Sequence, residues 1–173
     1  MTARRQETSG VGFGTGPCPG IAAIGLLASL FVLACLPVAR AATTERVVAN
    51  RYTGVAIEGF DPVAYFVDAR PAIGRDDMEA SEAGVVWRFR NEGNRASFVA
   101  HPEVYAPQFG GHDPADLARG VTVAGNPRFW LIWGERLYLF AREQSRDAFR
   151  ANPERLLHDA NQRWPALEQD LAQ

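Results

Sequence analysis

The chain has 173 residues, of which 47% are hydrophobic, and a formal net charge of −2 at pH 7. This length and composition favour one globular domain with a hydrophobic core. All 18 basic residues are arginine, so the chain has no lysine to act as a nucleophile, as a Schiff base or as a general base. No extended basic stripe with interleaved aromatic residues appears, which argues against nucleic acid as a partner.

An apolar segment near the N-terminus predicts export. Residues 21–38 are almost all apolar or small, follow two arginines, and end at Ala39-Arg40-Ala41. This order is typical of a secretory signal peptide with small residues at its cleavage site. We therefore expect a signal peptide over residues 1–41, cleavage near Ala41, and a periplasmic or secreted bacterial protein.

Two alternatives would attach the protein to a membrane. Cys35 lies in a stretch that loosely resembles a lipoprotein cleavage site, and the apolar segment could also stay uncleaved as an anchor. The other cysteine, Cys18, also lies in the predicted signal peptide. The mature domain would then have no disulfide, and no thiolate to offer a metal ion or a substrate.

After a polar leader over residues 42–54, the predicted domain covers residues 55–173. It opens with a short strand over residues 55–57, which turns into a helix. Asp61 is the expected cap of this helix, and Pro62 follows it at a position where proline suits a helix start.

Two stretches alternate apolar and polar residues around a glycine-containing turn, and they predict β-hairpins. The first hairpin pairs residues 78–82 with residues 85–90. The second pairs residues 129–133 with residues 136–140. Each hairpin is followed by a predicted helix.

The second hairpin strand and its helix occur twice in the sequence. Residues 86–105 match residues 137–156 without a gap, at an offset of 51. Seven of these twenty positions are identical: Phe89/Phe140, Glu92/Glu143, Arg95/Arg146, Phe98/Phe149, Ala100/Ala151, Pro102/Pro153 and Glu103/Glu154. We expect Asn94 and Ser145 to cap the two helices, and the final helix to end at Pro165. The fold class is therefore α+β: a small single domain of two duplicated β-hairpin–helix units with an added C-terminal helix.

Two sequence blocks carry a family resemblance. Residues 59–66 read G-F-D-P-V-A-Y-F, and residues 105–111 read Y-A-P-Q-F-G-G. With these blocks, residues 55–167 resemble the exported branch of the YHS domain family. The resemblance implies a small α+β domain of bacterial exported proteins. The wider family is linked to the handling of heavy metals such as copper.

The chain departs from that family at the cysteines that bind metal. The family pattern places cysteines at the positions of Ala64, Arg90 and Asn94, and none of these residues can bind a soft metal ion. Exported relatives commonly have Tyr-Cys after the Gly-Gly turn, where this chain has His112 and Asp113.

His112 and Asp113 are the best remaining metal ligands, since imidazole and carboxylate groups suit zinc, copper(II) or nickel. A divalent metal ion is the only cofactor that the sequence suggests. A third ligand would come from Asp61, Glu58 or His101. The alternative is that Asp113 caps a short helix, with His112 as an exposed turn residue. We also expect His158 to be exposed.

No motif indicates an enzyme, because no serine lies in a nucleophile elbow and no pair of acids has a catalytic spacing. Tyr65, Tyr105 and Phe109 are candidates to line a small-ligand cleft between the duplicated units. The sequence predicts an exported, non-catalytic binding domain for a small molecule or a protein. A periplasmic metal-binding protein and a weak enzyme are the alternatives.

Overall fold

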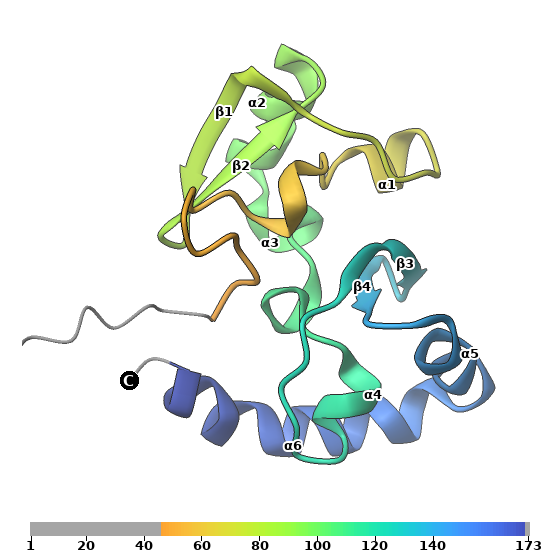
Figure 1. Ribbon diagram of the computed structural model, residues 1–173. Coiled ribbons are helices and arrows are strands. Elements are labelled where there is room, and N and C mark those ends of the chain that lie inside the picture. Colours follow the sequence, from red (N-terminus) through yellow and green to blue (C-terminus); the bar gives the residue numbers. More distant parts are fainter. Residues whose placement is uncertain (1–45, 172–173) are drawn as a thin grey trace, which may run out of the picture. The chain divides into compact units, whose positions relative to one another are not determined.

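The computed structural model describes residues 46–171, which form a small α+β domain (Figure 1). The predicted signal peptide, the cleavage point near Ala41 and Cys35 lie outside the described residues. None of the helices within 46–171 has the length and hydropathy needed to cross a bilayer. The elements in chain order are η2 (Ile57–Gly59), α1 (Ala64–Val67), β1 (Arg75–Glu82), β2 (Val85–Phe89), α2 (Glu92–Ala100), α3 (Pro102–Tyr105), η3 (Gln108–Gly111), α4 (Pro114–Leu117), β3 (Asn126–Trp133), β4 (Arg136–Phe140), α5 (Glu143–Ala151) and α6 (Pro153–Leu171).

The two predicted hairpins are confirmed, and each starts three residues earlier than expected. β1 pairs with β2 and β3 with β4, both antiparallel, and the pairing shifts register at the same place in each hairpin. Both turns have positive φ at their two central residues, Ala83 (53°) with Gly84 (78°) and Gly134 (54°) with Glu135 (59°). This turn geometry matches the right-handed twist of paired strands. α2 packs on the first hairpin and α5 on the second.

The duplication reaches further back than the sequence match. Each copy begins with three successive residues at positive φ: Ile57, Glu58 and Gly59 at 40°, 55° and 79°, and Phe109, Gly110 and Gly111 at 56°, 60° and 89°. An Asp-Pro pair follows each turn two residues later. The offset between the two turns is 52. It becomes 51 in the hairpins because the second copy has one residue fewer between its turn and its hairpin. We call residues 57–105 the first copy and residues 109–156 the second copy.

A glycine holds each turn against its hairpin. The N–H of Gly74 donates to the carbonyl of Gly59, and the N–H of Gly125 donates to the carbonyl of Gly111, both at 2.9 Å. A Cβ on Gly125 would lie only 2.6 Å from the carbonyl oxygen of Gly111, and a Cβ on Gly74 would lie 2.6 Å from Cβ of Arg88. Only glycine lets the two backbones approach this closely.

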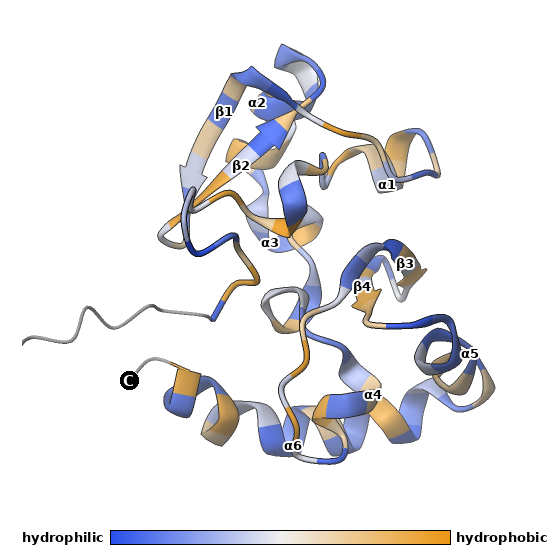
Figure 2. Ribbon diagram, in the orientation of Figure 1, coloured by the Kyte–Doolittle hydropathy of each residue, from blue (hydrophilic) through white to orange (hydrophobic). Residues whose placement is uncertain are grey.

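One hydrophobic core draws residues from both copies. Leu137 and Leu139 of β4 pack in the same cluster as Trp87 and Phe89 of β2. The alternate residues of β4, Tyr138 and Phe140, form a second cluster on its other face. β4 is therefore buried on both faces over residues 137–140, whereas β2 alternates between buried and partly exposed residues. Figure 2 shows hydrophobic residues recurring among hydrophilic ones along α6, which packs on α4 and α5.

The predicted helix caps and the predicted first strand are wrong. Asn94 and Ser145 lie inside their helices and are buried, while Asn91 and Arg142 occupy the N-cap positions. Residues 55–57 do not form a strand, because 55 and 56 make only isolated bridges and 57 starts a 3-10 turn.

Pro165 does not end α6, which continues to Leu171. Pro165 and Asn161 are both exposed. Water can therefore bond to the carbonyl of Asn161, which loses its intrahelical donor at the proline.

Candidate functional site

The two Asp-Pro pairs place two carboxylates at equivalent points of the two copies. Asp61 is fully buried. Its Oδ1 accepts the N–H groups of Val63 (2.9 Å) and Ala64 (3.3 Å), as a cap would, but α1 itself begins two residues later than predicted, with Val63 at its N-cap position. Its Oδ2 accepts the N–H of Arg90 (2.8 Å) and Nδ2 of Asn94 (2.6 Å). Asp61 therefore joins the start of α1 to the end of β2 and to α2.

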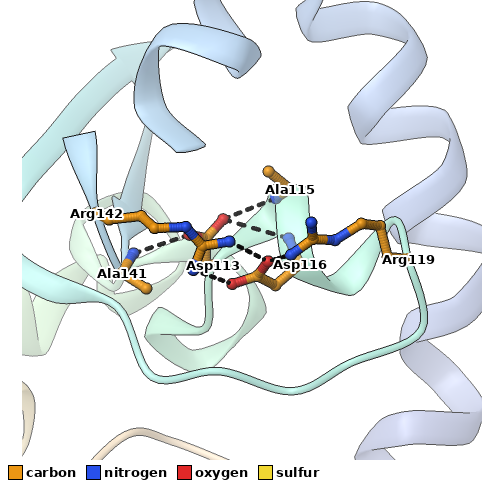
Figure 3. A network of polar contacts seen from close by, with 6 residues as sticks. All are labelled: Asp113, Ala115, Asp116, Arg119, Ala141 and Arg142. Atoms are coloured by element: carbon orange, nitrogen blue, oxygen red, sulfur yellow. Dashed lines mark hydrogen bonds and ion pairs between the residues drawn. The ribbon is translucent and has the colours of Figure 1, made fainter. Parts of the chain in front are cut away.

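Asp113 repeats this arrangement in the second copy (Figure 3). Its side chain is fully buried, and its Oδ1 accepts the N–H groups of Ala115 (2.8 Å) and Asp116 (3.4 Å). Its Oδ2 accepts the N–H of Ala141, just after β4, at 2.8 Å. Both carboxylate oxygens thus serve backbone donors, as in the alternative in which Asp113 caps a helix.

His112 is not an exposed turn residue. Its side chain is buried, with 5% of the residue exposed, and its ring lies 5.7 Å from that of Trp164 in α6. A backbone bridge to Ala124 holds it in place. The sequence around His112 gave no sign of this burial, because Trp164 and Ala124 come from later parts of the chain.

The three predicted donors of a third ligand lie in different settings. Asp61 belongs to the first copy and is bonded as described above. Glu58 is exposed in the left-handed turn, and Nδ1 of the exposed His101 lies 3.4 Å from Oε1 of Glu103. Within residues 46–171, no group of three or more histidine, cysteine, aspartate or glutamate residues is placed to hold a metal ion. His158 is exposed, as expected, and its Nε2 lies 2.9 Å from Nε2 of Gln162.

The three aromatic candidates do not share one cleft. The hydroxyl of Tyr65 donates to the carbonyl of Pro127 at 2.8 Å, and Tyr65 is part of the shared core. Burial, reinforced by the nearby carboxylates of Glu58 and Asp61, raises the pKa of Tyr65 above its ordinary value. Tyr105 packs edge-on against Phe66 at 5.3 Å, beside the shared core. Phe109 packs instead against the second cluster.

A mainly apolar cavity of about 290 Å³ lies beside Trp87. Its apolar walls come from the leader, from β2 and from the segment after α2: Val47, Trp87, Pro102, Ala106 and Pro107. Two exposed acidic residues, Glu82 and Glu103, also line it. The indole N–H of Trp87 already donates to the carbonyl of Glu82 at 3.2 Å, so the ring offers this cavity an apolar surface. We call it the Trp87 pocket.

The second copy differs from the first at the position of Ala106, where it has a larger side chain packed against its own cluster. Tyr138 takes the place of Trp87, and its ring packs against Phe109 with 6.3 Å between the ring centres. Leu157 packs against the same cluster, and at an offset of 51 its counterpart is the small Ala106 of the Trp87 pocket. The difference arises because α3 ends at Tyr105, whereas α6 continues past the equivalent point.

Comparisons with known proteins give no further guide to the site. No protein-family model, no curated protein and no solved structure matches the chain. The resemblance to YHS domains therefore remains a prediction from the sequence blocks quoted above.

A second cavity, of about 410 Å³, is lined by three arginines of the second copy: Arg119 after α4, Arg142 before α5 and Arg155 in α6. Asp116 is fully buried, and its carboxylate lies between the guanidinium groups of Arg119 and Arg142 (Figure 3). The hydrogen bond to Asp116 raises the pKa of Arg142. No local sequence pattern predicts this cavity, because its four charged residues come from α4, the turn after α4, the loop before α5, and α6.

Proposed function

We propose that this chain is an exported, non-catalytic binding domain of the YHS type, and that the Trp87 pocket is its ligand site. The observation that carries the proposal is the difference between the two copies. At the same point of the repeat, the second copy packs Leu157 against its cluster, whereas the first copy has the small Ala106 beside a cavity. Export is supported by the sequence of residues 1–41.

The walls of the Trp87 pocket favour a small ligand with an apolar body. Its volume of about 290 Å³ is at the lower end of the range for small-molecule sites. The carboxylates of Glu82 and Glu103 favour a cationic group over an anionic one. Arg136 donates to the backbone carbonyl of Glu103, at 3.4 Å, and not to its carboxylate. The favoured ligand class is therefore a small amine or ammonium compound with an apolar portion.

The contacts of Asp113 do not support extending this proposal to a metal site. Its two oxygens accept three backbone N–H groups that hold α4 to β4, so most of its lone-pair sites are already used. A metal ion that displaced one of these donors would leave a buried N–H group without an acceptor, which is costly.

Filling the Trp87 pocket tests the proposal. In Ala106→Leu, the first copy receives the residue that the second copy has at this point. We expect this variant to bind the neutral fluorescent probe N-phenyl-1-naphthylamine at least about tenfold more weakly than the wild type, because the added side chain occupies the apolar space. The thermal midpoint should stay within about 4 °C of the wild type.

The matched control is Ala96→Leu, which adds the same side chain on the exposed side of α2. It should bind the probe like the wild type. Competition with octylammonium and with octanoate then tests the ligand charge, and octylammonium should displace the probe at the lower concentration. Equal probe affinity in the two leucine variants would place the site elsewhere, and equal competition would refute the role of the carboxylates.

A further inference from the structure

We propose that the cavity between α4, α5 and α6 is a second ligand site, which binds a phosphate or carboxylate group of a small molecule. Arg119, Arg142 and Arg155 line this cavity, and Asp116 is the one acidic residue among its lining residues. We call it the arginine pocket. It shares no lining residue with the Trp87 pocket, so it does not depend on the function proposed above.

The arginines of this pocket retain donors for a ligand. Arg142 uses Nη1 (3.1 Å) and Nη2 (2.8 Å) on Asp116, and Arg119 uses Nη2. A guanidinium group has five N–H donors, so most donors of these two side chains lie outside these bonds. Arg155 is 76% exposed, and its Nε is 3.8 Å from Asp159, beyond hydrogen-bonding distance.

Asp116 orients two of the three arginines. A buried carboxylate bonded to two guanidinium groups restricts the rotamers of both side chains before a ligand arrives, which lowers the entropy cost of binding. Planar guanidinium forks match phosphate and carboxylate oxygens in pairs. With three positive charges and one negative charge around it, the cavity favours an anion.

The comparison of the copies supports the same assignment. In the first copy, Asn91 caps α2, and its Oδ1 accepts the N–H of Asn94 at 2.8 Å. The equivalent residue of the second copy is Arg142, which has no side-chain acceptor, and α5 begins without a side-chain cap. Ser145, which corresponds to Asn94, lines the arginine pocket. An oxygen of a bound anion would take the role that Asn91 has in the first copy, in addition to its bonds to the arginines.

Inorganic phosphate and citrate are suitable probes, measured by isothermal titration calorimetry on the mature chain against sodium chloride at equal ionic strength. We expect one or both to bind above the chloride background and to raise the thermal midpoint. Binding of phosphate alone or of citrate alone would show which oxyanion the pocket prefers. No binding of either probe above chloride would overturn the proposal.

Two arginines on neighbouring helices provide a matched pair of variants. Arg155→Gln removes a pocket arginine whose nearest acid, Asp159, is 3.8 Å away. Arg150→Gln removes an exposed arginine that does not line the pocket and whose nearest acid, Asp147, is 3.7 Å away. We expect Arg155→Gln to weaken binding about tenfold and Arg150→Gln to leave it unchanged. Equal affinities in the two variants would refute the site.

A third variant, Arg142→Asn, copies the residue of the first copy. It should lose most of the anion binding while the new asparagine caps α5. Circular dichroism at 222 nm checks that it is folded, and if it is not, the pair at positions 155 and 150 still decides the question.

Discussion

Tyr65 shows how one residue joins the two copies. It belongs to α1 of the first copy, but its hydroxyl donates to Pro127 and its ring packs edge-on against Trp130 at 5.2 Å, both in β3 of the second copy. Burial raises its pKa because ionisation would place a charge in the core. The neutral hydroxyl is therefore part of what holds the copies together.

Alkaline pH should weaken this link. The pKa of Tyr65 in the folded protein lies above the ordinary tyrosine value of about 10, so its contribution to stability is complete below pH 10 and is lost as the pH rises through the folded pKa. Above pH 10, we expect Tyr65 to lower the free energy of unfolding by up to about 1.4 kcal/mol per pH unit. Urea unfolding of the wild type and of Tyr65→Phe at pH 7 and pH 11 measures this.

Tyr65→Phe should cost about 1 kcal/mol at pH 7, because the carbonyl of Pro127 loses its donor. The difference from the wild type should then become smaller at pH 11. Tyr105→Phe, which changes a half-buried ring, is the control. An equal fall in stability between the two pH values in the wild type and in Tyr65→Phe would contradict this account.

At the scale of elements, Asp61 and Asp113 each tie a short helix to a hairpin. Such short helices do not persist alone, because helix formation needs a costly first turn. Each carboxylate supplies that turn with two acceptor bonds and connects it to the residue after β2 or β4. The same set of carboxylate contacts therefore fixes the first helix of each copy to its hairpin.

Replacing Asp113 should cost much more than replacing an ordinary cap. We expect Asp113→Ala to lower the free energy of unfolding by about 3 kcal/mol, because buried N–H groups lose a charged acceptor. Asn91→Ala, at an exposed cap with one accepted bond, should cost about 1 kcal/mol. Urea unfolding of both variants gives the comparison, and equal costs would show that the buried carboxylate acts only as a cap.

The sequence predicted both hairpins from the alternation of apolar and polar residues around a glycine-containing turn, and it predicted the helices after them, which lie in the part of the repeat that aligns without a gap. Phe98 and Phe149, which are identical in that part, are both fully buried. The sequence did not reveal that the Asp-Pro turns belong to the repeat, since one residue fewer in the second copy changes the offset from 51 to 52. The burial of His112 and the two pockets depend on contacts between distant segments. No local pattern of residue types carries that information.

At the scale of the described domain, the copies depend on each other. Leu137 and Leu139 of the second copy complete the core formed by Ile57, Trp87 and Phe89 of the first. Without them, the first copy would expose a large part of its apolar surface. A unit of this size already buries only a modest fraction of its surface on folding.

We therefore expect neither half to fold alone. Fragments 42–107 and 108–173 should each lack a cooperative thermal transition by circular dichroism, whereas residues 42–173 in one continuous chain should show one transition. Mixing the fragments at equal concentrations should restore part of the helical signal. A cooperative transition in either isolated fragment would show that the shared core is not required.

The burial of β4 on both faces also has a consequence for the order of folding. Each hairpin and its helix join residues that are near in sequence, so they can form early and reversibly. Leu137 and Leu139 can reach Ile57 only after most of the chain between them has been closed into a loop, and that closure carries an entropy cost before any contact is gained. We expect the docking of β4 against the first copy to limit the refolding rate, with Tyr138 and Phe140 packing before it.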